Sequence, residues 1–458
     1  MRRHTPLLAA ALALGVLAVG LQAQPFDYPS ARPSTSWANT DASLTHHVTF
    51  MDGSVARAAL LRLNPAGFGP SYAFGFFCTN HGTAAGAGPC NDFLLAVAVA
   101  YCNSGALMTS TVSGIPQVVW SANRARPVGE GATLHFTPPG DLVLKAADGT
   151  LVWSAGTARK SVAGISINSD GNLVMVDADN LAVWQSFDHP TDTLLVGQSL
   201  RQGARLTANT SAVKWAGSRL YLTVADDSLS AYVDATPPQR YYQLGFTKAA
   251  GAYATYVNGS LTVFAPPAAP LTAVQLPAVG AGTVQYMRLE YDGHLRLYEW
   301  RPAGWAPVFD VLRLFPDDCA FPTVCGAYGV CTDMQCSCPD AANFRAVDFR
   351  RPSRGCVPAG PAASCAAARL VSLPGLAYFN DHATSMRTLE RVSEGACKKA
   401  CLDECRCVAA QFIYGADAGD GFCYLQSEVF SLETSLPEVV HYNSTMHLKV
   451  QATRATSA

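Results

Sequence analysis

Three short segments of the chain end in tryptophan and recur at nearly constant spacing. They are QVVW ending at Trp120, TLVW ending at Trp153 and LAVW ending at Trp184, which are 33 and 31 residues apart. Each segment alternates apolar and polar residues and is bounded by Gly or Asp, which is typical of antiparallel strands joined by tight turns. A period of about thirty residues indicates one supersecondary unit used several times. We expect the tryptophans to point inward and share one core, because a single hairpin cannot bury its own apolar face.

Fifteen cysteines are distributed unevenly along the 458 residues. Cys78, Cys90 and Cys102 come first, six cysteines lie between 319 and 356, and another six lie between 365 and 423. The long stretch between the first group and the second has none. This distribution indicates an oxidising compartment. It also predicts a β region with its own core, followed by two small modules held together by crosslinks.

The N-terminal segment reads MRRHTPLLAAALALGVLAVGLQAQ. Two arginines precede an apolar core from Leu7 to Leu21, and Leu-Gln-Ala follows as a small-residue cleavage site. We expect residues 1–23 to be a secretory signal peptide. A membrane anchor is the alternative, but the apolar core is short for a bilayer span. The mature chain then begins near Gln24, contains no second membrane segment, and is secreted into the extracellular space or cell wall.

The charge pattern limits the classes of binding partner that we expect. The formal net charge is −2, charged residues make up 14% of the chain, and no long run of one sign occurs. This pattern favours neither nucleic acid nor an anionic membrane surface as a partner.

Three phrases, VVWSANRARPV, DGNLVMVDADNLAVWQSFDHPTDTLL and FPDDCAFPTVCGAYGVC, occur in this order along the chain. Together they resemble the ectodomain of plant S-locus glycoproteins and G-type lectin S-domain receptor kinases, over roughly residues 36–450. The resemblance implies a mainly β chain with four parts. These are a β-prism bulb-type lectin region at 24–199, a β-rich S-locus glycoprotein-like domain at 200–315, an EGF-like module at 316–358 and an α+β PAN/apple domain at 363–450. The glycine-rich phosphate loop, H-R-D and D-F-G sequences of a kinase are missing, so the kinase and membrane parts of related receptors are not expected here.

The stretch from Ser169 to Leu195 contains the side-chain types of a hydrolase triad. They are Ser186, Asp188, His189 and Asp192. These four lie within seven residues, whereas a working nucleophile, base and orienting group usually converge from separate segments. No G-x-S-x-G elbow surrounds Ser186. We therefore expect an ordered turn without catalytic residues, and a chain that is not an enzyme.

The same stretch also contains a candidate sugar site. Bulb-type lectins bind mannose through Q-x-D-x-N-x-V-x-Y, whose spacing places the named residues on one face of a strand. The matching positions here are Asn168, Asp170, Asn172, Val174 and Val176. Asp170, Asn172 and Val174 match, a shorter amide replaces Gln, and a valine replaces Tyr; in the preceding repeat only Val143 matches. Each lost hydrogen bond costs about 1 kcal/mol, so a site at Asn168, Asp170 and Asn172 would be weak, and a turn feeding a core strand is the alternative.

Cysteine spacing and the resemblance together give an expected set of crosslinks. Cys397, Cys401 and Cys405 recur every four residues, as on one face of a helix that Ser393 could cap. Spacing alone allows fifteen pairings for six cysteines. The resemblance implies Cys319–Cys331, Cys325–Cys336, Cys338–Cys356, Cys365–Cys405, Cys397–Cys423 and Cys401–Cys407. Cys78 and Cys90 flank the loop TNHGTAAGAGP and form the expected seventh pair, which leaves Cys102 as a buried thiol or an intermolecular link. No metal or cofactor is expected, because C-x2-C pairs are missing and the ligands of calcium-type EGF modules are not evident.

Three sequons, at Asn209, Asn258 and Asn443, predict glycosylated loops that face solvent. The resemblance implies a secreted, non-enzymatic recognition glycoprotein that binds a protein, peptide or glycan ligand, in pollen recognition or immune perception. A receptor-kinase ectodomain and a mannose-type glycan are the implied partners, and a homodimer is one expected arrangement. Two alternatives are an active mannose-binding lectin and a structural cell-wall glycoprotein.

Overall fold

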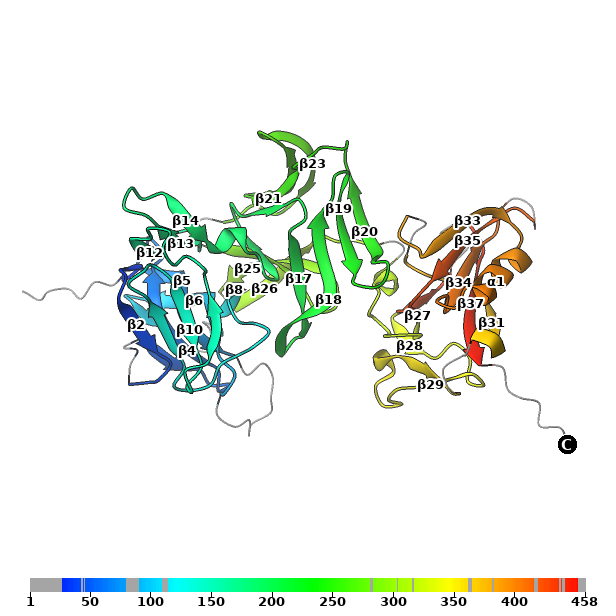
Figure 1. Cartoon of the computed structure of the whole chain (residues 1–458), viewed down its shortest axis with the longest axis horizontal. Coiled ribbons are helices and arrows are strands. Elements are labelled where there is room, and N and C mark those ends of the chain that lie inside the picture. The colour runs from blue at the N-terminus through cyan, green and yellow to red at the C-terminus, as the bar shows by residue number, and fades with distance from the viewer. Residues whose placement is uncertain are drawn as a thin grey trace, which may run out of the picture.

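The computed structural model describes residues 27–451 apart from positions 43, 45, 80–89, 109–113, 281–282, 303, 315–316, 361–364, 381–382, 416–418, 436–437 and 439–440. The expected signal peptide and most of the loop between Cys78 and Cys90 lie outside the described residues. The described part is mainly β, as predicted, and contains one α-helix near its C-terminal end. The elements form an elongated body, with the first strands at one end and the helix at the other (Figure 1).

Three antiparallel sheets form the first structural unit. Their strand orders are β3-β4-β5-β6-β7 with β8 paired to β6, β11-β10-β9-β2, and β1-β12-β13-β14. The three sheets share one buried core, to which they contribute Phe74, Leu134 and Met175 respectively, among others. This is the arrangement of a β-prism, as the resemblance implied. The strands are β1 (Ser30–Ala31), β2 (Thr35–Ala38), β3 (His47–Thr49), β4 (Val55–Arg62), β5 (Phe68–Cys78), β6 (Leu94–Asn103), β7 (Ala106–Leu107), β8 (Gln117–Ser121), β9 (Thr133–Phe136), β10 (Leu142–Lys145), β11 (Leu151–Ser154), β12 (Gly164–Ile167), β13 (Leu173–Val176) and β14 (Ala182–Gln185).

The three tryptophans of the repeat meet inside this unit. The ring centroids of Trp120, Trp153 and Trp184 are 5.7–6.0 Å apart, and each pair is edge-to-face. Such pairs contribute about 0.5–1.5 kcal/mol each beyond the apolar area they bury. The prediction that the repeats share one core through their tryptophans is confirmed.

A second unit repeats the three-sheet arrangement, but its tryptophans, Trp215, Trp300 and Trp305, are not part of its apolar core. Its four-stranded sheets are β15-β24-β25-β26, β16-β21-β22-β23 and β17-β18-β19-β20, and they contribute Met287, Leu261 and Leu222 to a common core. β15 and β16 pair with β24 and β21, so the second unit begins near residue 193, whereas the sequence placed its start at residue 200. The strands are β15 (Thr193–Leu195), β16 (Ser199–Arg201), β17 (Arg205–Ser211), β18 (Lys214–Val224), β19 (Ser228–Val233), β20 (Gln239–Gly245), β21 (Tyr253–Val257), β22 (Ser260–Ala265), β23 (Ala269–Gln275), β24 (Gln285–Leu289), β25 (Leu295–Arg301) and β26 (Gly304–Asp310), and the single turn of 3-10 helix η1 (Ser186–Asp188) precedes them.

The two cysteine-rich segments share a sheet with each other and a core with the second unit. β27 pairs in parallel with β36 in a sheet of order β28-β27-β36-β32, and β31-β37-β34-β35-β33 form a five-stranded sheet. Phe321, Phe430 and Leu448 join the apolar core of the second unit. The elements are η2 (Asp318–Ala320), β27 (Val330–Thr332), β28 (Gln335–Ser337), β29 (Phe344–Ala346), η3 (Pro352–Arg354), β30 (Cys356–Pro358), η4 (Cys365–Ala367), β31 (Ala368–Pro374), β32 (Leu376–Ala377), β33 (Arg387–Val392), α1 (Glu394–Asp403), β34 (Ala409–Ile413), β35 (Gly421–Gln426), β36 (Leu432–Thr434) and β37 (Ser444–Gln451).

Helix α1 begins and packs as its sequence predicts. The Ser393 hydroxyl accepts a hydrogen bond from the Ala396 N–H at 3.2 Å, which is an N-cap contact. Cys397 and Cys401 lie on the buried face of the helix. Cys405 follows the helix end rather than continuing its face.

Seven disulfides are present in the structure. They are Cys78–Cys90, Cys319–Cys331, Cys325–Cys336, Cys338–Cys356, Cys365–Cys405, Cys397–Cys423 and Cys401–Cys407. These are the pairs that the sequence and the resemblance implied. The remaining cysteine, Cys102, is free and buried. Burial raises the pKa of its thiol to about 12, so it is a protonated core residue rather than a link between chains.

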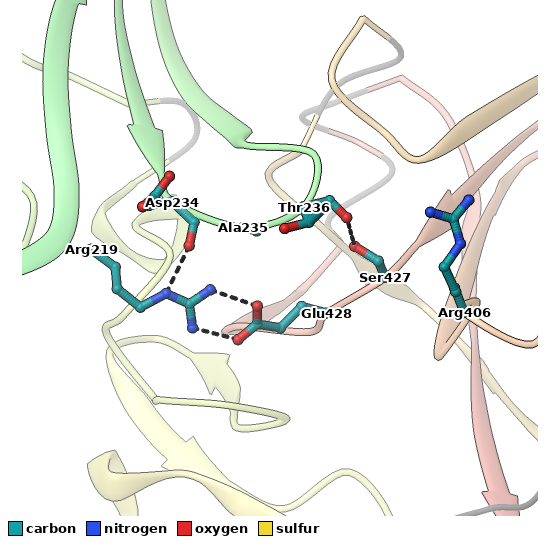
Figure 2. Close-up of a pocket in the computed structure, with 7 residues that line it drawn as sticks. All are labelled: Arg219, Asp234, Ala235, Thr236, Arg406, Ser427 and Glu428. Atoms are coloured by element: carbon teal, nitrogen blue, oxygen red, sulfur yellow. Dashed lines mark hydrogen bonds and ion pairs between the residues drawn. The ribbon is translucent and has the colours of Figure 1, made fainter.

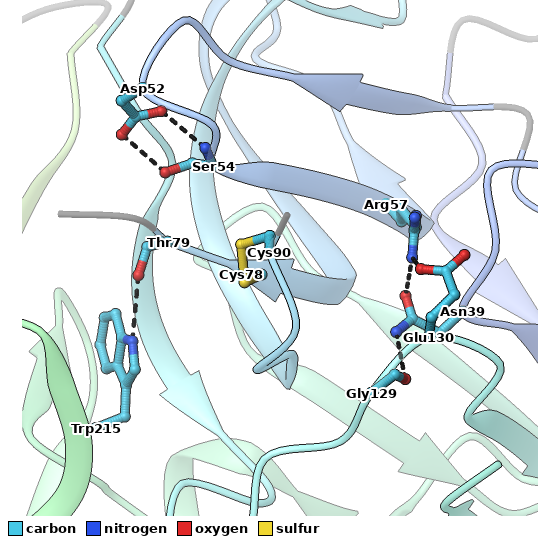
Figure 3. Close-up of a disulfide and its surroundings, with 10 residues drawn as sticks. All are labelled: Asn39, Asp52, Ser54, Arg57, Cys78, Thr79, Cys90, Gly129, Glu130 and Trp215. Atoms are coloured by element: carbon cyan, nitrogen blue, oxygen red, sulfur yellow. Dashed lines mark hydrogen bonds and ion pairs between the residues drawn. A yellow bond between two sulfur atoms is a disulfide. The ribbon is translucent and has the colours of Figure 1, made fainter. Parts of the chain in front are cut away.

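Polar contacts close the junction between the first and second units. The Trp215 indole N–H donates to the Thr79 hydroxyl at 3.2 Å beside the Cys78–Cys90 disulfide (Figure 3). On the first unit itself, the Arg57 guanidinium donates to Asn39 at 2.6 Å.

Candidate functional site

The candidate sugar residues lie on a tight turn between β12 and β13. The Asn168 N–H donates to the Asn172 carbonyl at 2.9 Å, and the Asp170 carboxylate accepts from the Asn172 N–H at 3.1 Å. Gly171 is required here, because its φ is +86° and a Cβ would lie 2.5 Å from the Tyr72 ring. The turn is therefore held against Tyr72 of β5, with Asn168, Ser169 and Asp170 exposed.

The same turn recurs at several other places in the described chain, and in some of these copies, as in the candidate turn, the fifth residue is buried. In residues 137–141 and in residues 290–294, the first residue again donates its N–H to the carbonyl of the fifth. In the earlier copy the fifth residue, Asp141, accepts a hydrogen bond from the Ser154 hydroxyl at 2.6 Å. In the later copy the fifth residue, His294, lies with Nδ1 2.5 Å from the Asp310 carboxylate. In these two copies the fifth residue is an internal anchor, whereas in the turns at 146–150 and 177–181 the fifth residue is exposed.

Asn172 has the same anchoring role in the candidate turn. Its side chain is 6% exposed. Its Nδ2 donates to Gln185 at 3.0 Å, and its Oδ1 accepts from the Ser186 hydroxyl and the Phe187 N–H, both at 3.2 Å. All its polar atoms are used inside the protein. The structure therefore groups Asn168 with Asp170 and separates them from Asn172.

The hydrolase-like side chains do not form a triad. The Ser186 hydroxyl bonds to Asn172 and Leu173, and the His189 ring stacks on Trp184 with centroids 5.4 Å apart. Asp188 accepts from Gln185 at 2.9 Å. The contacts of these side chains stabilise the end of β14 and the turn that follows it.

Asn168 and Asp170 open onto a hollow of about 740 Å³. Its other walls come from the loop between β4 and β5 and from the N-terminal end of the described chain. A second hollow of about 400 Å³ shares Arg62, Leu63, Asn64, Pro65 and Ser169 with the first, so the two are continuous. We call this surface the lectin-unit groove. Its lining includes Asp27, Arg62, Leu63, Asn64, Pro65, Gly67, Asn168, Ser169 and Asp170, and continues to Tyr72, Thr283 and Val284.

The groove combines polar groups with apolar walls. The Arg62 guanidinium is paired with Asp27 at 2.8 Å and donates to the Ile167 carbonyl at 3.3 Å, which fixes its position. Burial raises the pKa of Tyr72 far above its usual value, and the nearby charge of Asp170 acts in the same direction. Tyr72 is therefore a neutral wall, and Asp170 is the negatively charged acceptor beside it.

Arg62, Asn64 and Asp27 were not identified as site residues from the sequence. They come from a loop and a terminal segment that carry no ligand-binding motif. The phrase RLNPAG indicates a turn through its Asn-Pro step, but gives no sign of which distant turn it faces.

A separate hollow of about 460 Å³ lies between the second unit and the C-terminal module (Figure 2). Arg219 makes two contacts with the Glu428 carboxylate, at 2.5 and 2.6 Å, and donates to the Asp234 carbonyl at 2.7 Å. The Ser427 hydroxyl donates to the Thr236 carbonyl at 2.6 Å. The groups in this hollow satisfy one another, so it is an interface that joins two parts of the chain.

In the described ranges, no group of three or more His, Cys, Asp or Glu side chains is arranged to hold a metal ion. Within the same ranges, no helix has the length and apolar character needed to cross a bilayer.

Comparison with known proteins identifies relatives of both the first unit and the longer chain. A family described as D-mannose binding lectin matches residues 117–216. The chain is 30% identical to EP1-like glycoprotein 1 of Arabidopsis thaliana over 48% of this chain and 57% of that protein, so it spans little more than half the length of that relative. It is 31% identical to EP1-like glycoprotein 4 of the same plant over 69% of this chain and 74% of that protein.

A third relative is a G-type lectin S-receptor-like serine/threonine-protein kinase of Arabidopsis thaliana. It is 26% identical over 74% of this chain and 39% of its own length. These relatives confirm the resemblance to S-domain proteins that the sequence suggested. The seven disulfides require an oxidising compartment, and the chain is extracellular. It belongs to the family of EP1-like glycoproteins, secreted proteins built on a bulb-type lectin unit.

Proposed function

We propose that this glycoprotein binds a saccharide in the lectin-unit groove and does not alter it chemically. The observation that carries the proposal is the convergence of Asn168 and Asp170 with Arg62 and Asn64 on one concave surface. Ligand sites are commonly concave, with apolar walls and a few placed polar groups. Carboxylate and amide side chains accept from and donate to hydroxyl groups, which is the chemistry that a sugar presents.

The expected ligand is a neutral sugar residue with adjacent hydroxyls. Asp170 would accept from two hydroxyls, and the Asn168 amide would donate and accept. The Asn64 amide already accepts from the Ala66 N–H and donates to the Pro70 carbonyl, so it would offer its second N–H and its second lone pair. The apolar faces of Leu63 and Pro65 would contact the ring. Each hydrogen bond contributes about 1 kcal/mol net, so about four give a millimolar dissociation constant for a single sugar. Useful affinity then requires an oligosaccharide or several copies of the chain.

We further propose that binding serves extracellular recognition, of the pollen-recognition or immune type, rather than catalysis. The relative that is a lectin receptor kinase supports a signalling partner of that kind. A pull-down of receptor-kinase ectodomains with the purified protein tests this role. Recovery of abundant protein from salt-washed cell wall without any captured ectodomain would favour the structural alternative instead.

The saccharide proposal is tested on a glycan array, followed by calorimetry with the oligosaccharides that bind. Asn168→Ala and Asp170→Ala should each weaken binding several-fold; both side chains are exposed, but Asp170→Ala should also lower the unfolding temperature slightly, because it removes the contact to the Asn172 N–H. The matched control is Asp179→Ala, which removes the same charge from an exposed turn outside the groove. Equal binding by Asp170→Ala and by the control would refute the site.

Asn172→Ala separates this proposal from an active mannose-binding lectin. In a mannose site of the usual pattern, Asn172 would contact the sugar directly. Here its contacts to Gln185 and Ser186 are internal, so the substitution should lower the unfolding temperature before it affects binding. Mannose binding that is lost on Asn172→Ala at unchanged stability would establish the alternative.

A further inference from the structure

A short loop of the EGF-like segment carries a dense positive charge. Residues 345–354 read RAVDFRRPSR, with four arginines and one aspartate. All four arginines are exposed, in a protein whose formal net charge is −2. The loop begins at β29, which lies at the lower margin of the molecule (Figure 1). We call residues 345–354 the basic loop.

We propose that the basic loop binds an acidic polysaccharide through the carboxylates of its uronic acid residues. The guanidinium group presents N–H donors in a fixed fork that matches a carboxylate, which makes arginine better suited than lysine to this contact. Arg354 lies 3.8 Å from Asp348 and is still well exposed. The other three arginines add positive charge that the single aspartate does not balance.

The backbone of the basic loop is held in place before any ligand arrives. The Val347 N–H donates to the Gly355 carbonyl at 2.9 Å, and the Arg350 N–H donates to the Asp348 carboxylate at 3.0 Å. The Cys338–Cys356 disulfide closes the loop behind the arginines. A ligand therefore meets charges on an ordered backbone, which reduces the entropy lost on binding.

Apolar side chains stand among the arginines. Phe349 is 79% exposed and Val347 is also exposed, and the Arg350 guanidinium carbon lies 5.4 Å from the Phe349 ring centre. Exposed apolar groups beside charges mark interaction surfaces when they are grouped rather than scattered. A sugar ring offers both kinds of contact, because its C–H face is apolar and its carboxylate projects from the edge.

The position of the arginines favours a polysaccharide over a peptide. Arg350 lies on a turn, and Arg354 ends the 3-10 turn η3, so neither lies along a strand edge to which a peptide strand could add. A polyanion needs only a row of charges. Its repeated carboxylates would also engage several copies of a weak site, which raises the effective affinity without new contacts.

The test uses the full secreted chain with its disulfides intact and polygalacturonate as the probe. Binding should be strong at low salt, should fall as salt rises, and should be lost when the polymer is methyl-esterified, because esterification removes the carboxylate charge. The triple variant Arg350→Gln, Arg351→Gln, Arg354→Gln should weaken binding at least about tenfold. The matched control Arg159→Gln, Lys160→Gln, Arg387→Gln removes three exposed positive charges elsewhere and should bind as the wild type does.

Four outcomes would overturn the proposal. They are absence of wild-type binding, equal loss in the triple variant and its control, binding to poly-glutamate as tight as to polygalacturonate, and binding only to phosphatidylserine vesicles. The third would assign the loop to acidic peptides and the fourth to membranes. Asp170→Ala should leave polygalacturonate binding unchanged, so this result is independent of the lectin-unit groove.

Discussion

Arg288 and Asp192 lie 3.7 Å apart at the buried junction between the two three-sheet units. Arg288 also donates to the Val118 carbonyl at 2.5 Å and to the Thr193 hydroxyl at 3.2 Å. Because Val118 is on β8 of the first unit and Arg288 on β24 of the second, this guanidinium joins the two. The Asp192 side chain is 3% exposed, so its polar contacts are made inside the protein rather than to water.

Replacing Arg288 by Met should destabilise the junction by roughly 3–5 kcal/mol, because it removes a cation 3.7 Å from a buried carboxylate together with the hydrogen bonds to Val118 and Thr193. The double variant Arg288→Met, Asp192→Asn should recover part of that loss. Urea unfolding of the wild type, both single variants and the double variant measures the coupling. Additive losses in the double variant would show that the two charges do not stabilise each other.

The fold of the first unit could be predicted from its sequence because Trp120, Trp153 and Trp184 mark each repeat. The second unit has the same three-sheet form but no such marker. Its inward positions are aliphatic, such as Leu222 and Leu261, and they alternate with polar residues as in any half-buried strand. The sequence therefore predicts strands there, but not their grouping.

The first sequon differs from the other two in its surroundings. Asn258 and Asn443 are exposed, as predicted. Asn209 instead lies within β17, where its amide donates to Asp192 at 3.0 Å and accepts from Arg124 at 2.6 Å. A glycan on this nitrogen would break both contacts, so the expectation of an exposed loop fails at Asn209.

We expect glycans at Asn258 and Asn443 and none at Asn209 in the folded, secreted protein. Glycopeptide mass spectrometry measures the occupancy of each site. Asn258→Gln and Asn443→Gln should each lower the mass of the intact protein by one glycan, whereas Asn209→Gln should leave the mass unchanged. Loss of a glycan from the Asn209→Gln protein would contradict the prediction.

Gly171 offers a test of how the candidate site is positioned. Gly171→Ala would place a Cβ 2.5 Å from Tyr72 and 2.7 Å from Leu195, in addition to the strain of a positive φ. Gly149→Ala is the matched control, since Gly149 has φ of +84° and open space at the Cβ position.

The control should cost about 1 kcal/mol from backbone strain alone, and Gly171→Ala about 1–3 kcal/mol more from overpacking. Only Gly171→Ala should also weaken saccharide binding, because it moves Asn168 and Asp170 away from the groove. Thermal unfolding and calorimetry on both variants measure the two effects. Equal behaviour of the two variants would mean that the turn is not held against Tyr72.

The candidate site could be predicted only in part. The mannose-type pattern located the turn that holds Asn168 and Asp170, because their spacing is local. It assigned Asn172 to the ligand, since no local pattern shows that Gln185 and Ser186 return to bind its amide. The contacts that bury the Asn172 side chain come from residues 13 and 14 positions further along the chain. The basic loop is hard to recognise from sequence for a related reason: only Arg350 and Arg351 are adjacent, so its four arginines form no long run.

His447 gives the protein a pH dependence in its C-terminal module. The side chain is fully buried, with Nδ1 3.0 Å from the Ser372 hydroxyl. Burial lowers its pKa from 6.5 to about 4, and the positive charge of Lys398 on α1 acts in the same direction, against the opposing charge of Glu394. Between pH 6.5 and pH 4 the unfolded chain therefore binds a proton that the folded chain does not. The contribution of His447 to stability is complete above pH 6.5 and is lost as the pH falls, by about 3 kcal/mol.

The measurement is urea unfolding from pH 7 to pH 4 for the wild type and His447→Gln. Glu433 acts oppositely, because burial raises its pKa to about 7 and its stabilisation is lost as the pH rises from 4.5 through 7. The two groups partly cancel in the wild-type profile, so the difference between wild type and variant isolates His447. That difference should shrink by about 3 kcal/mol on going from pH 7 to pH 4. The control is His441→Gln, at an exposed histidine, whose stability profile should follow that of the wild type. If the His447→Gln profile were parallel to the wild-type profile, burial of His447 would not oppose its protonation.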